Sequence, residues 1–587
     1  MHQRHFARVG PRRAKVVFYV FLALATFLGW RLCKVQVIDG PLLAKEALAQ
    51  RSDSVEVFAR RGSILDREGN VLVRSLPSES VYAVPHDIAD PDATLAKLRT
   101  VFGKIDPQIA AMLHDRHAWF VWIARKIPHD QADRIAALDI PGIALKEEDT
   151  GVRVDTAGQM ASTVLGFVGL DENGLDGAEY SFDSLLRGQS GRVVLETDQF
   201  GRPIPFGHEQ TIKAAKPGMT LQLTIDSYLQ YVTETALDAQ VKKWHAQSGT
   251  AIVMDPWTGE VLALANSPHF DPNRYWKYPA GSLRDRAVMD AYEPGSTFKL
   301  VTAAAAIDSG KVTTGTRFPS HDTLEVGGRT IHNAEDGFLA GSGSSETLAD
   351  IIAESHNVGA AEVGLHIGGR TFYNMERRAG FGEPTKIGLP GENPGIVPAP
   401  KDWSGSSLAT MSFGQGVSVT PIAMARFYSA IANGGMLLRP RILHAVLDPQ
   451  GNVAYRYRTE VEHRVFSKST AKTLMSFLRA VVVRGTGNPS AQIPGYATAG
   501  KTGTAQMVEN GRYEPGAYVA SFIGLIPYRH PRYVIYVKVE RPEGAIYGGV
   551  VAAPAFVQIA KAAMIHSGVL PAPSPAPRLV DSAKAAK

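Results

Sequence analysis

A serine and a lysine three residues apart, Ser296 and Lys299, have the types and spacing best suited to chemistry in this chain. A serine hydroxyl is a poor nucleophile until a base removes its proton. Pro294 and Gly295 predict a turn before a helix-like run over 297–307, which places Ser296 at a helix N-terminus, where free N–H groups favour a developing anion. Lys299 then lies over the same face, and burial would lower its pKa so that it can act as the base.

The same spacing recurs at Ser469 and Lys472, in a polar stretch that no Pro-Gly turn precedes. A solvated helix face explains this second match without any chemistry. Ser-x-x-Lys alone is therefore a weak signal, and the interpretation of the first match depends on what accompanies it downstream.

A second polar element is Ser355-His-Asn357, which lies in a stretch that we expect to be helical over 348–359. The side chain of Asn357 supplies both a donor and an acceptor, which suits binding of a peptide backbone. Ser355 could relay a proton between the base and a leaving amine. Alone, the element is typical of an ordinary helix end.

The third element is Lys501-Thr-Gly-Thr504, for which the flanking pattern predicts an edge strand beside the site. Gly503 has no side chain, so another backbone can approach it closely. The backbone N–H groups of Thr504 and Ser296 could form an oxyanion hole. The hydroxyls of Thr502 and Thr504, together with Lys501, could bind a substrate carboxylate. Alone, this element would be interpreted as a surface hairpin.

Size and charge restrict the function. A chain of 587 residues is too long for one core, so several domains are expected. A hydrophobic content of 44% and a charged content of 20% are ordinary for globular proteins. The net charge of +5 is small, and no basic stripe with interleaved aromatics is present, so nucleic acid is not an expected partner. The spacing of the histidines indicates no metal site, and we expect no cofactor.

The N-terminus combines a cationic segment over 1–15 with an apolar run from Val16 to Trp30, which Leu32 and Cys33 extend past Arg31. An uncleaved membrane anchor explains this better than a cleavable signal peptide, because no small-x-small site follows the run. The cationic cluster would then hold residues 1–15 in the cytoplasm and export the remainder. Cys33 is the single cysteine, so no intrachain disulfide can form.

The rest of the chain predicts an α+β protein of several domains. A mixed region covers 37–215, and in it Arg60 to Asn70 predicts strand, turn and strand. Its two arginines are interpreted as structural in preference to the alternative, a binding patch. A boundary near Lys216 opens a region over 216–567, in which helices separate the strands of one antiparallel sheet. The Pro/Ala-rich segment 568–587 is expected to be a disordered tail. Further strands are predicted over 221–225, 251–254, 261–264, 518–525 and 533–539.

Taken together, the three elements follow one another at intervals of 59 and 146 residues, in the order typical of penicillin-binding proteins and class A β-lactamases. The chain resembles the class B penicillin-binding proteins, which are monofunctional peptidoglycan transpeptidases, and most resembles their division-specific type. The resemblance runs from the anchor to about residue 560. Other segments that carry it are Arg60-Arg-Gly-Ser-Ile-Leu-Asp-Arg-Glu-Gly69, Gly177-Ala-Glu-Tyr180, Leu186-Arg-Gly188, Phe413 to Pro421, Tyr547-Gly-Gly549 and Ala552-Ala-Pro554.

The resemblance implies a transmembrane helix over 16–36, a mixed, β-rich pedestal domain over 37–215, and a transpeptidase domain over 216–567. The last would have the α/β/α fold of penicillin-binding proteins and serine β-lactamases. The expected place is the inner membrane, with the catalytic domain outside the cytoplasm. The implied partners are stem peptides ending in D-Ala-D-Ala, β-lactams as covalent inhibitors, and a membrane glycan polymerase with other division proteins.

The resemblance also implies a role for each site residue. Ser296 would attack the penultimate D-alanine carbonyl, with Lys299 as the base and Ser355 as the proton relay. Asn357 would hold the donor amide. The segment from Lys501 to Thr504 would fix the terminal carboxylate and the oxyanion. His356 replaces the aspartate of the class A pattern and is assigned no chemical role.

Four alternatives compete with this interpretation, and the sequence argues against the last two. An elongation-specific transpeptidase has the same chemistry. A scaffold that chiefly activates a glycan polymerase would use the pedestal. A signalling receptor needs a cytoplasmic effector, for which about 15 residues before the anchor leave no room. A class A β-lactamase needs a glutamate four residues before an asparagine, and no glutamate between the second and third elements has one.

Overall fold

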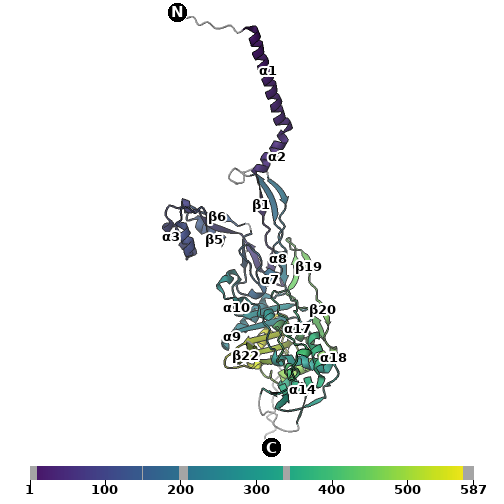
Figure 1. The fold of residues 1–587 in the computed structure, drawn as a ribbon. Helices are drawn as coiled ribbons and strands as arrows, with labels where there is room; N and C mark the ends of the chain where they lie inside the picture. Colours follow the sequence, from purple (N-terminus) through teal and green to yellow (C-terminus); the bar gives the residue numbers. More distant parts are fainter. Residues whose placement is uncertain (1–9, 149, 197–208, 335–343, 510, 573–587) are drawn as a thin grey trace. The chain divides into compact units, whose positions relative to one another are not determined.

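The protein is described by a computed structural model that covers residues 10–148, 150–196, 209–334, 344–509 and 511–572 (Figure 1). The chain divides into two compact units. The first unit joins the N-terminal segment up to Ala59 with residues 189–216. The second unit contains residues 60–188 and everything from Pro217 onward. Each unit is considered separately below.

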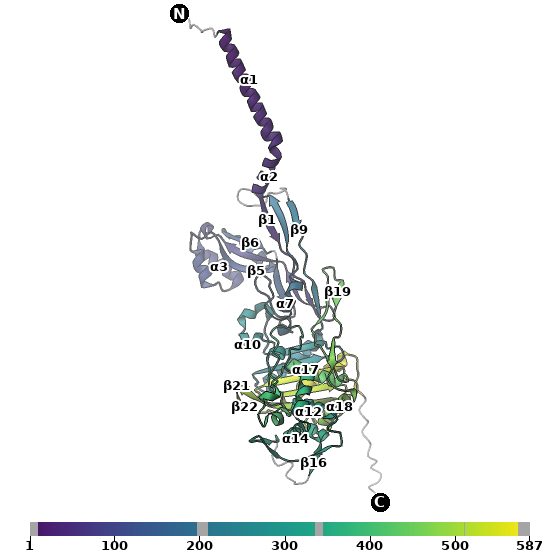
Figure 2. The same cartoon turned by 45° about the vertical axis from the view of Figure 1, so that its right-hand side comes forward.

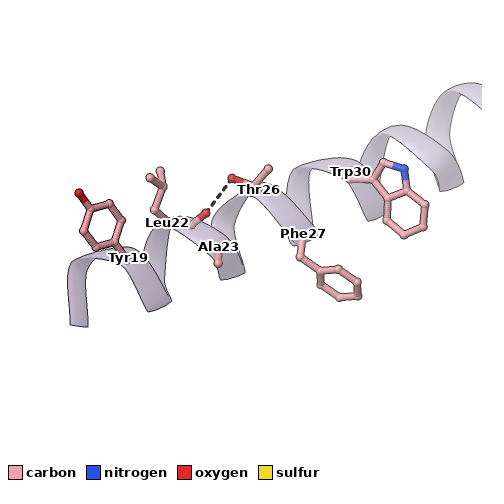
Figure 3. A pocket seen from close by; sticks show the side chains of 6 residues that line it. All are labelled: Tyr19, Leu22, Ala23, Thr26, Phe27 and Trp30. Carbon is pink, nitrogen blue, oxygen red and sulfur yellow. Dashed lines mark hydrogen bonds between the residues drawn. The ribbon is translucent and has the colours of Figure 1, made fainter. Parts of the chain in front are cut away.

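The first unit begins with a long apolar helix. Helix α1 (Pro11–Cys33) continues through a π-helical turn, Lys34–Ile38, and is followed by α2 (Gly40–Arg51). The helical segment Pro11–Ile38 has 28 residues and a mean hydropathy of 1.9, and is long and apolar enough to cross a membrane. In Figure 3 the hydroxyl of Thr26 donates to the carbonyl oxygen of Leu22 at 2.7 Å, so this polar group is satisfied within an apolar helix.

A short antiparallel sheet completes the first unit. Its strand order is β1-β8-β9, and the register pairs Val57 with Gly191 and Arg192 with Lys213. This sheet joins a segment that directly follows the helices to two segments more than 130 residues further along the chain. The bounds are β1 (Ser52–Val57), β8 (Gly191–Glu196) and β9 (Glu209–Lys213).

The second unit contains a six-stranded sheet that unites distant parts of the sequence. The predicted strand–turn–strand is confirmed as β2 and β3, and the buried Asp66 accepts hydrogen bonds from the N–H groups of Glu68 and Asn70. Strand β2 pairs in parallel with β10. The sheet order is β19 (Val453–Arg456), β18 (Leu443–Leu447), β10 (Thr220–Leu223), β2 (Ile64–Leu65), β3 (Val71–Leu76) and β7 (Val152–Asp155).

Arg61 is buried, which confirms the structural interpretation for this arginine, whereas Arg60 is exposed. Its guanidinium lies 2.6 Å from a carboxylate oxygen of Glu179 and 2.7 Å from one of Asp183. Arg153 contacts the other oxygen of Glu179 at 2.7 Å. The two acids belong to short helices, α7 (Gly177–Ser181) and α8 (Asp183–Leu186), so Arg61 ties the start of this unit to a segment about 120 residues later.

A smaller α+β layer follows β3. Strands β4 (Ser78–Ala83), β5 (Val121–Pro128) and β6 (Ile143–Glu147) pair in the order β5-β4-β6. Their apolar side chains form a core with the helices, which includes Val81, Leu98 and Ile135. The helices are α3 (Pro91–Phe102), α4 (Pro107–Leu113) and α5 (His129–Ala136).

The rest of the second unit is built around a five-stranded antiparallel sheet (Figure 2). Successive residues of its strands face opposite cores: Ala251 and Val253 pack with helices α9 (Ser227–Lys243) and α20 (Ala553–His566), whereas Ile252 packs with the helices of the other face. The predicted α/β/α layering is confirmed. The strand order is β12 (Val261–Ser267), β11 (Ser248–Met254), β23 (Tyr533–Glu540), β22 (Arg512–Ile526) and β21 (Ala499–Glu509).

The helices of the second face lie between β12 and β21 in the sequence. The α-helices described between these two strands are α10 (Ala280–Leu283), α11 (Arg286–Met289), α12 (Lys299–Asp308), α13 (Leu348–Glu354), α14 (Asn357–Ile367), α15 (Gly369–Arg378), α16 (Ser407–Met411), α17 (Pro421–Ala432) and α18 (Lys468–Arg484). Of the predicted tail, residues 573–587 lie outside the described residues, as do residues 1–9 of the predicted cytoplasmic segment.

Replacing Arg61 with alanine should destabilise the second unit by about 3 kcal/mol, because Glu179 and Asp183 then stay buried with one cation fewer. Arg60→Ala is the matched control, since the neighbouring arginine is exposed. Urea unfolding followed by tryptophan fluorescence measures both variants. Equal midpoints for the two would show that the buried ion pairs do not stabilise this unit.

Candidate active site

Ser296 lies in a tight 3-10 turn, Gly295–Phe298, that leads directly into α12. The prediction of a turn followed by a helix is confirmed, with the serine in the turn just before the α-helical residues. The hydroxyl of Thr297 donates to the carbonyl oxygen of Pro294 at 2.8 Å, and the hydroxyl of Tyr428 donates to the carbonyl oxygen of Thr297 at 2.8 Å. These bonds hold the turn against the core while Ser296 stays partly exposed.

Lys299, the first residue of α12, is completely buried. Its amine contacts the amide oxygen of Asn357 at 2.8 Å, the hydroxyl oxygen of Ser355 at 3.3 Å, and the carbonyl oxygen of Ser355. Burial lowers the pKa of this amine well below its ordinary value, and the nearby charge of Lys501 lowers the pKa further, whereas Glu346 raises it.

The stretch expected to be helical over 348–359 is helical at both ends but is interrupted, because the chain turns at Ser355. Helix α13 ends there, and α14 begins at Asn357. Ser355 has a φ of +66°, in the left-handed region that residues with a side chain rarely adopt. This turn directs both the carbonyl and the hydroxyl of Ser355 at Lys299, which a residue inside a helix could not do because its carbonyl would bond along the helix axis.

Lys501 approaches Ser355 from the opposite side. It lies on β21, which is an edge strand as predicted, and its amine is 2.8 Å from the Ser355 hydroxyl oxygen. The hydroxyl of Ser355 therefore stands between two buried amines. Burial lowers the pKa of Lys501 to about 7, partly offset by the charge of Glu354. The hydroxyl of the next residue, Thr502, is 2.6 Å from that of Thr486.

Two glycines allow β21 to pack directly against the serine turn. A Cβ at Gly503 would lie 2.3 Å from Ser521 Oγ and 3.0 Å from a methyl group of Thr297. A Cβ at Gly295, whose φ is +52°, would lie 2.8 Å from the carbonyl oxygen of Thr504. The sequence elements around Ser296 and Lys501 are thus brought side by side, as their order along the chain predicted.

Thr504 completes the strand side of the site. Its hydroxyl accepts a hydrogen bond of 3.4 Å from the N–H of Gly548, the first residue of α19 (Gly548–Val551). A Cβ at Gly548 would lie 2.6 Å from the carbonyl oxygen of Gly503. Gly548 of the segment Tyr547-Gly-Gly549 therefore allows a close backbone approach to β21.

Residues that the sequence did not single out support the second element. Asn333 accepts hydrogen bonds from the N–H of Asn357 at 2.8 Å and from that of Val358 at 3.0 Å. Glu346, which is buried, lies 2.5 Å from Nδ1 of His356. No local pattern marks Asn333 or Glu346, because both reach the site through tertiary contacts.

The second Ser-x-x-Lys match does not reach the site. Ser469 and Lys472 lie in the first turns of α18, and both are exposed. The interpretation of this match as a solvated helix face is confirmed.

A groove of about 700 Å³ adjoins the serine turn. Its lining includes Glu293, Gly416 and Gln506. Glu293 accepts hydrogen bonds from the N–H of Gly416 at 2.8 Å and from the hydroxyl of Tyr513 at 3.1 Å, and burial raises its pKa. The groove continues along β21 beyond Thr504, so an extended peptide could follow the strand into it.

Comparison with known proteins decides which serine enzymes this site belongs to. The sequence model described as "Penicillin binding protein transpeptidase domain" matches residues 249–561, and that of the "Penicillin-binding Protein dimerisation domain" matches residues 56–223. The chain belongs to the class B penicillin-binding proteins. It is a peptidoglycan D,D-transpeptidase, and the buried lysines beside Ser296 are found in the matched transpeptidase domain.

Relatives of this penicillin-binding protein match it over nearly their whole length. Stage V sporulation protein D of Bacillus subtilis is 34% identical, over 94% of this chain and 84% of its own. The Peptidoglycan D,D-transpeptidase FtsI of Escherichia coli is 33% identical, over 94% of this chain and 91% of its own. Penicillin-binding protein PbpB of Mycobacterium tuberculosis is 33% identical, over 98% of this chain and 89% of its own.

Solved structures of penicillin-binding proteins show the same fold. Penicillin binding protein 3 of Mycobacterium tuberculosis, crystallised with aztreonam, gives a TM-score of 0.68 at 30% identity, covering 88% of this chain and 98% of its own. A peptidoglycan synthetase of Bifidobacterium adolescentis gives a TM-score of 0.71 at 26% identity, covering 89% of this chain and 98% of its own. The multidomain α+β fold predicted from the sequence is thereby confirmed.

The rate of Ser296 acylation by a chromogenic β-lactam should depend on pH as a bell-shaped curve. The rate rises with pH as Lys299 loses its proton, at a pH well below the ordinary lysine pKa. It falls again near pH 7, where Lys501, with a pKa of about 7, loses the positive charge that would hold the carboxylate of the β-lactam. Stopped-flow measurements across the pH range record both limbs.

Lys501→Arg is the matched variant for this profile, because a guanidinium stays charged throughout the range. The variant should lose the falling limb and keep the rising one, whatever its maximal rate. A falling limb that survives unchanged would assign it to a group other than Lys501.

Proposed function

We propose that the protein cross-links stem peptides during septal wall synthesis through an acyl-enzyme at Ser296. The observation that carries this proposal is the complete burial of Lys299, whose amine meets Ser355 and Asn357 immediately behind the serine turn. A buried amine with a lowered pKa is neutral part of the time, and a neutral amine can accept the proton of a serine hydroxyl.

Acylation begins with the attack of Ser296 Oγ on the carbonyl carbon of the penultimate D-alanine. Lys299 takes the hydroxyl proton as the new C–O bond forms. The C–N bond to the terminal D-alanine then breaks, and its nitrogen needs a proton to leave as an amine. Ser355 is the proposed relay for that proton, because its hydroxyl lies 3.3 Å from the amine of Lys299 and 2.8 Å from that of Lys501.

The second half of the reaction reverses these proton movements. The amine of a neighbouring stem peptide attacks the ester carbonyl, and its proton passes back through the same groups. The bond to Ser296 Oγ breaks, the serine recovers its proton from Lys299, and a new amide joins the two stem peptides. The enzyme returns to its starting state without a cofactor.

The edge strand β21 supplies the proposed binding groups. Lys501, with the hydroxyls of Thr502 and Thr504, would hold the terminal carboxylate of the donor peptide. The N–H groups of Ser296 and Thr504 would stabilise the oxyanion, and Asn357 would hold the donor amide. The close approach that Gly503 and Gly295 permit supports this assignment, because it places the serine turn beside the strand.

β-Lactams are proposed to acylate Ser296 because they resemble the D-alanyl-D-alanine end of the donor peptide. The crystal structures of Penicillin binding protein 3 from Mycobacterium tuberculosis with aztreonam and with ampicillin support this for a relative of the same fold.

Ser296→Ala should abolish covalent labelling by fluorescent penicillin, since the variant has no nucleophile at the turn. Ser469→Ala is the matched control, because it removes the serine of the exposed Ser-x-x-Lys match and should label like the wild type. Peptide mapping of the labelled wild-type chain identifies the modified residue. Label on any residue other than Ser296 would contradict the proposed mechanism.

The penicilloyl-enzyme should be long-lived. Between the second and third elements no glutamate is followed four residues later by asparagine, so the sequence lacks the pattern of the class A deacylating group. The labelled chain, chased with unlabelled penicillin, should release its label over minutes or longer, as gel fluorescence can measure. Rapid turnover to hydrolysed penicillin would instead indicate a β-lactamase.

The septal assignment rests on the resemblance to division-specific members and on the match to structures named Penicillin binding protein 3. We propose the same division of the chain as the sequence analysis did: cytoplasmic residues 1–15, an anchor over 16–36, a pedestal over 37–215, a transpeptidase domain over 216–567, and a tail. The helix Pro11–Ile38 supports a single span, with the catalytic domain outside the inner membrane. A glycan polymerase and other division proteins are the proposed partners.

Depletion of the protein should give filamentous cells, because septa no longer form while the side wall continues to grow. Rounded cells would instead assign the enzyme to elongation. Expressing the Ser296→Ala variant during depletion tests the scaffold alternative, with cell shape again recorded by microscopy. The variant should not restore septation, and restored septation would show that binding to a polymerase suffices.

A further inference from the structure

The middle residue of the second element, His356, has no part in the chemistry described above, yet its side chain is held by a buried acid. Its Nδ1 lies 2.5 Å from a carboxylate oxygen of Glu346, and the two side chains are 12% and 7% exposed. Glu346 lies on β16 (Ser345–Thr347), a short strand that directly precedes α13. A hydrogen bond to an ionised carboxylate is shorter and stronger than one between neutral groups.

This contact joins the two ends of α13. The helix occupies Leu348–Glu354, so Glu346 stands before its first turn and His356 just after its last one. Seven helical residues span about 10 Å, and the two side chains meet along that length. The start of the helix is fixed separately by a capping box, in which the side chains of Thr347 and Asp350 accept hydrogen bonds from each other's backbone N–H groups. The contact of Glu346 with His356 therefore ties the end of the helix back to this fixed start.

A glycine makes room for the same carboxylate on its other side. A Cβ at Gly359 would lie 2.4 Å from Oε1 of Glu346 and 2.8 Å from a side-chain carbon of Ile351. Gly359 is the third residue of α14, so the carboxylate lies against the first turn of that helix, where the positive end of the helix dipole favours an anion. Glu346 is thus held between the imidazole of His356 and the helix that begins with Asn357.

His356 separates the two residues that contact the buried amine of Lys299. The preceding residue, Ser355, turns its hydroxyl and its carbonyl to that amine. The following residue, Asn357, reaches it with its amide oxygen at 2.8 Å. Ser355 has a left-handed backbone, which a residue with a side chain keeps only where its surroundings enforce it. The anchor at His356 is one such constraint, because a shift of this residue would move both of its neighbours.

The carboxylate of Glu346 also acts on Lys299 through its charge. Burial and the positive charge of Lys501, which lies on β21, lower the pKa of Lys299, whereas the negative charge of Glu346, which lies on β16, raises it. His356 and Glu362, both near the start of α14, are further titratable groups beside Glu346. Removing the charge of Glu346 should therefore lower the pKa of Lys299 further.

We propose that Glu346 and His356 are positioning residues for acylation. The carboxylate of Glu346 holds the imidazole of His356, which fixes both of its chain neighbours against Lys299. The same carboxylate places a negative charge near the amine of Lys299. This inference rests on the proposed function, and it adds a pair of residues that act on the base and the relay without forming or breaking a bond.

The first test measures acylation of Ser296 by a chromogenic β-lactam in stopped flow, with the full chain in detergent. His356→Ala should lower the limiting acylation rate about tenfold or more and change the dissociation constant of the initial complex little, because it misplaces reacting groups. His356→Asn should recover most of the rate, since its amide can donate from nearly the position of Nδ1. His444→Ala is the matched control: Nδ1 of His444 lies 3.0 Å from a carboxylate oxygen of Glu260, and the variant should acylate like the wild type.

A double variant shows whether the two residues act as one unit. At the optimum pH of each chain, Glu346→Ala should lower the rate about as much as His356→Ala, and the double variant should be no slower than either single one. Losses that multiply in the double variant, or wild-type rates in both single variants, overturn the proposal. Thermal melting checks that each chain is folded.

Glu346→Gln tests the charge and keeps the proposal falsifiable if the alanine variants do not fold. The glutamine side chain can still accept from Nδ1 of His356 but has no charge, so the rising limb of the pH profile should move to lower pH by about half a unit or more. A rising limb at the wild-type pH in a folded Glu346→Gln chain overturns the proposal. A wild-type chain that does not acylate Ser296 would overturn the proposed function as well, whereas normal wild-type acylation with unchanged variants overturns this inference alone.

Discussion

The burial of one amine is the constraint on which the active site depends. Lys299 has no exposed surface, and a second buried amine, that of Lys501, shares the Ser355 hydroxyl with it. Two ammonium groups so close, and out of water, cannot both stay charged cheaply, and burial lowers the pKa of both amines. The fold thereby gives Lys299 the lowered pKa that its proposed role as a base requires.

The architecture around this pair supplies the close packing that such burial needs. The edge strand β21 approaches the serine turn without intervening side chains because Gly503 and Gly295 lack a Cβ. The turn at Ser355 then closes the space from the helical side, where its left-handed backbone turns the carbonyl towards Lys299. Sheet, turn and helix end each contribute one wall, so no single element could bury the two amines alone.

The sequence predicted the candidate site residues better than the residues that hold them in place. The spacing of Ser296 and Lys299 is local, but the Ser469 and Lys472 match shows that spacing alone was not enough, and the order of the three elements along the chain was needed to select the first pair. The left-handed turn at Ser355 was missed because the residues around it have helical propensity and tertiary contacts prevail over it. Glu346 and Asn333 were missed for a related reason: each acts across ten or more residues, and no periodic pattern joins them to the site. The strands of the five-stranded sheet were predictable because β11, β12 and β23 are apolar runs that are buried on both faces, whereas the pairing of β2 with β10 was not predictable.

The two Ser-x-x-Lys matches in this chain have the same spacing but different surroundings. Ser469 and Lys472 have the same spacing as Ser296 and Lys299, and both pairs stand at the start of a helix. The difference is that Lys472 is exposed and Lys299 is not. Burial lowers the pKa of Lys299 well below its ordinary value. Spacing is the same in the two pairs, so it is the removal of water, achieved here by residues from β21 and the Ser355 turn, that fits Lys299 for its proposed role as a base.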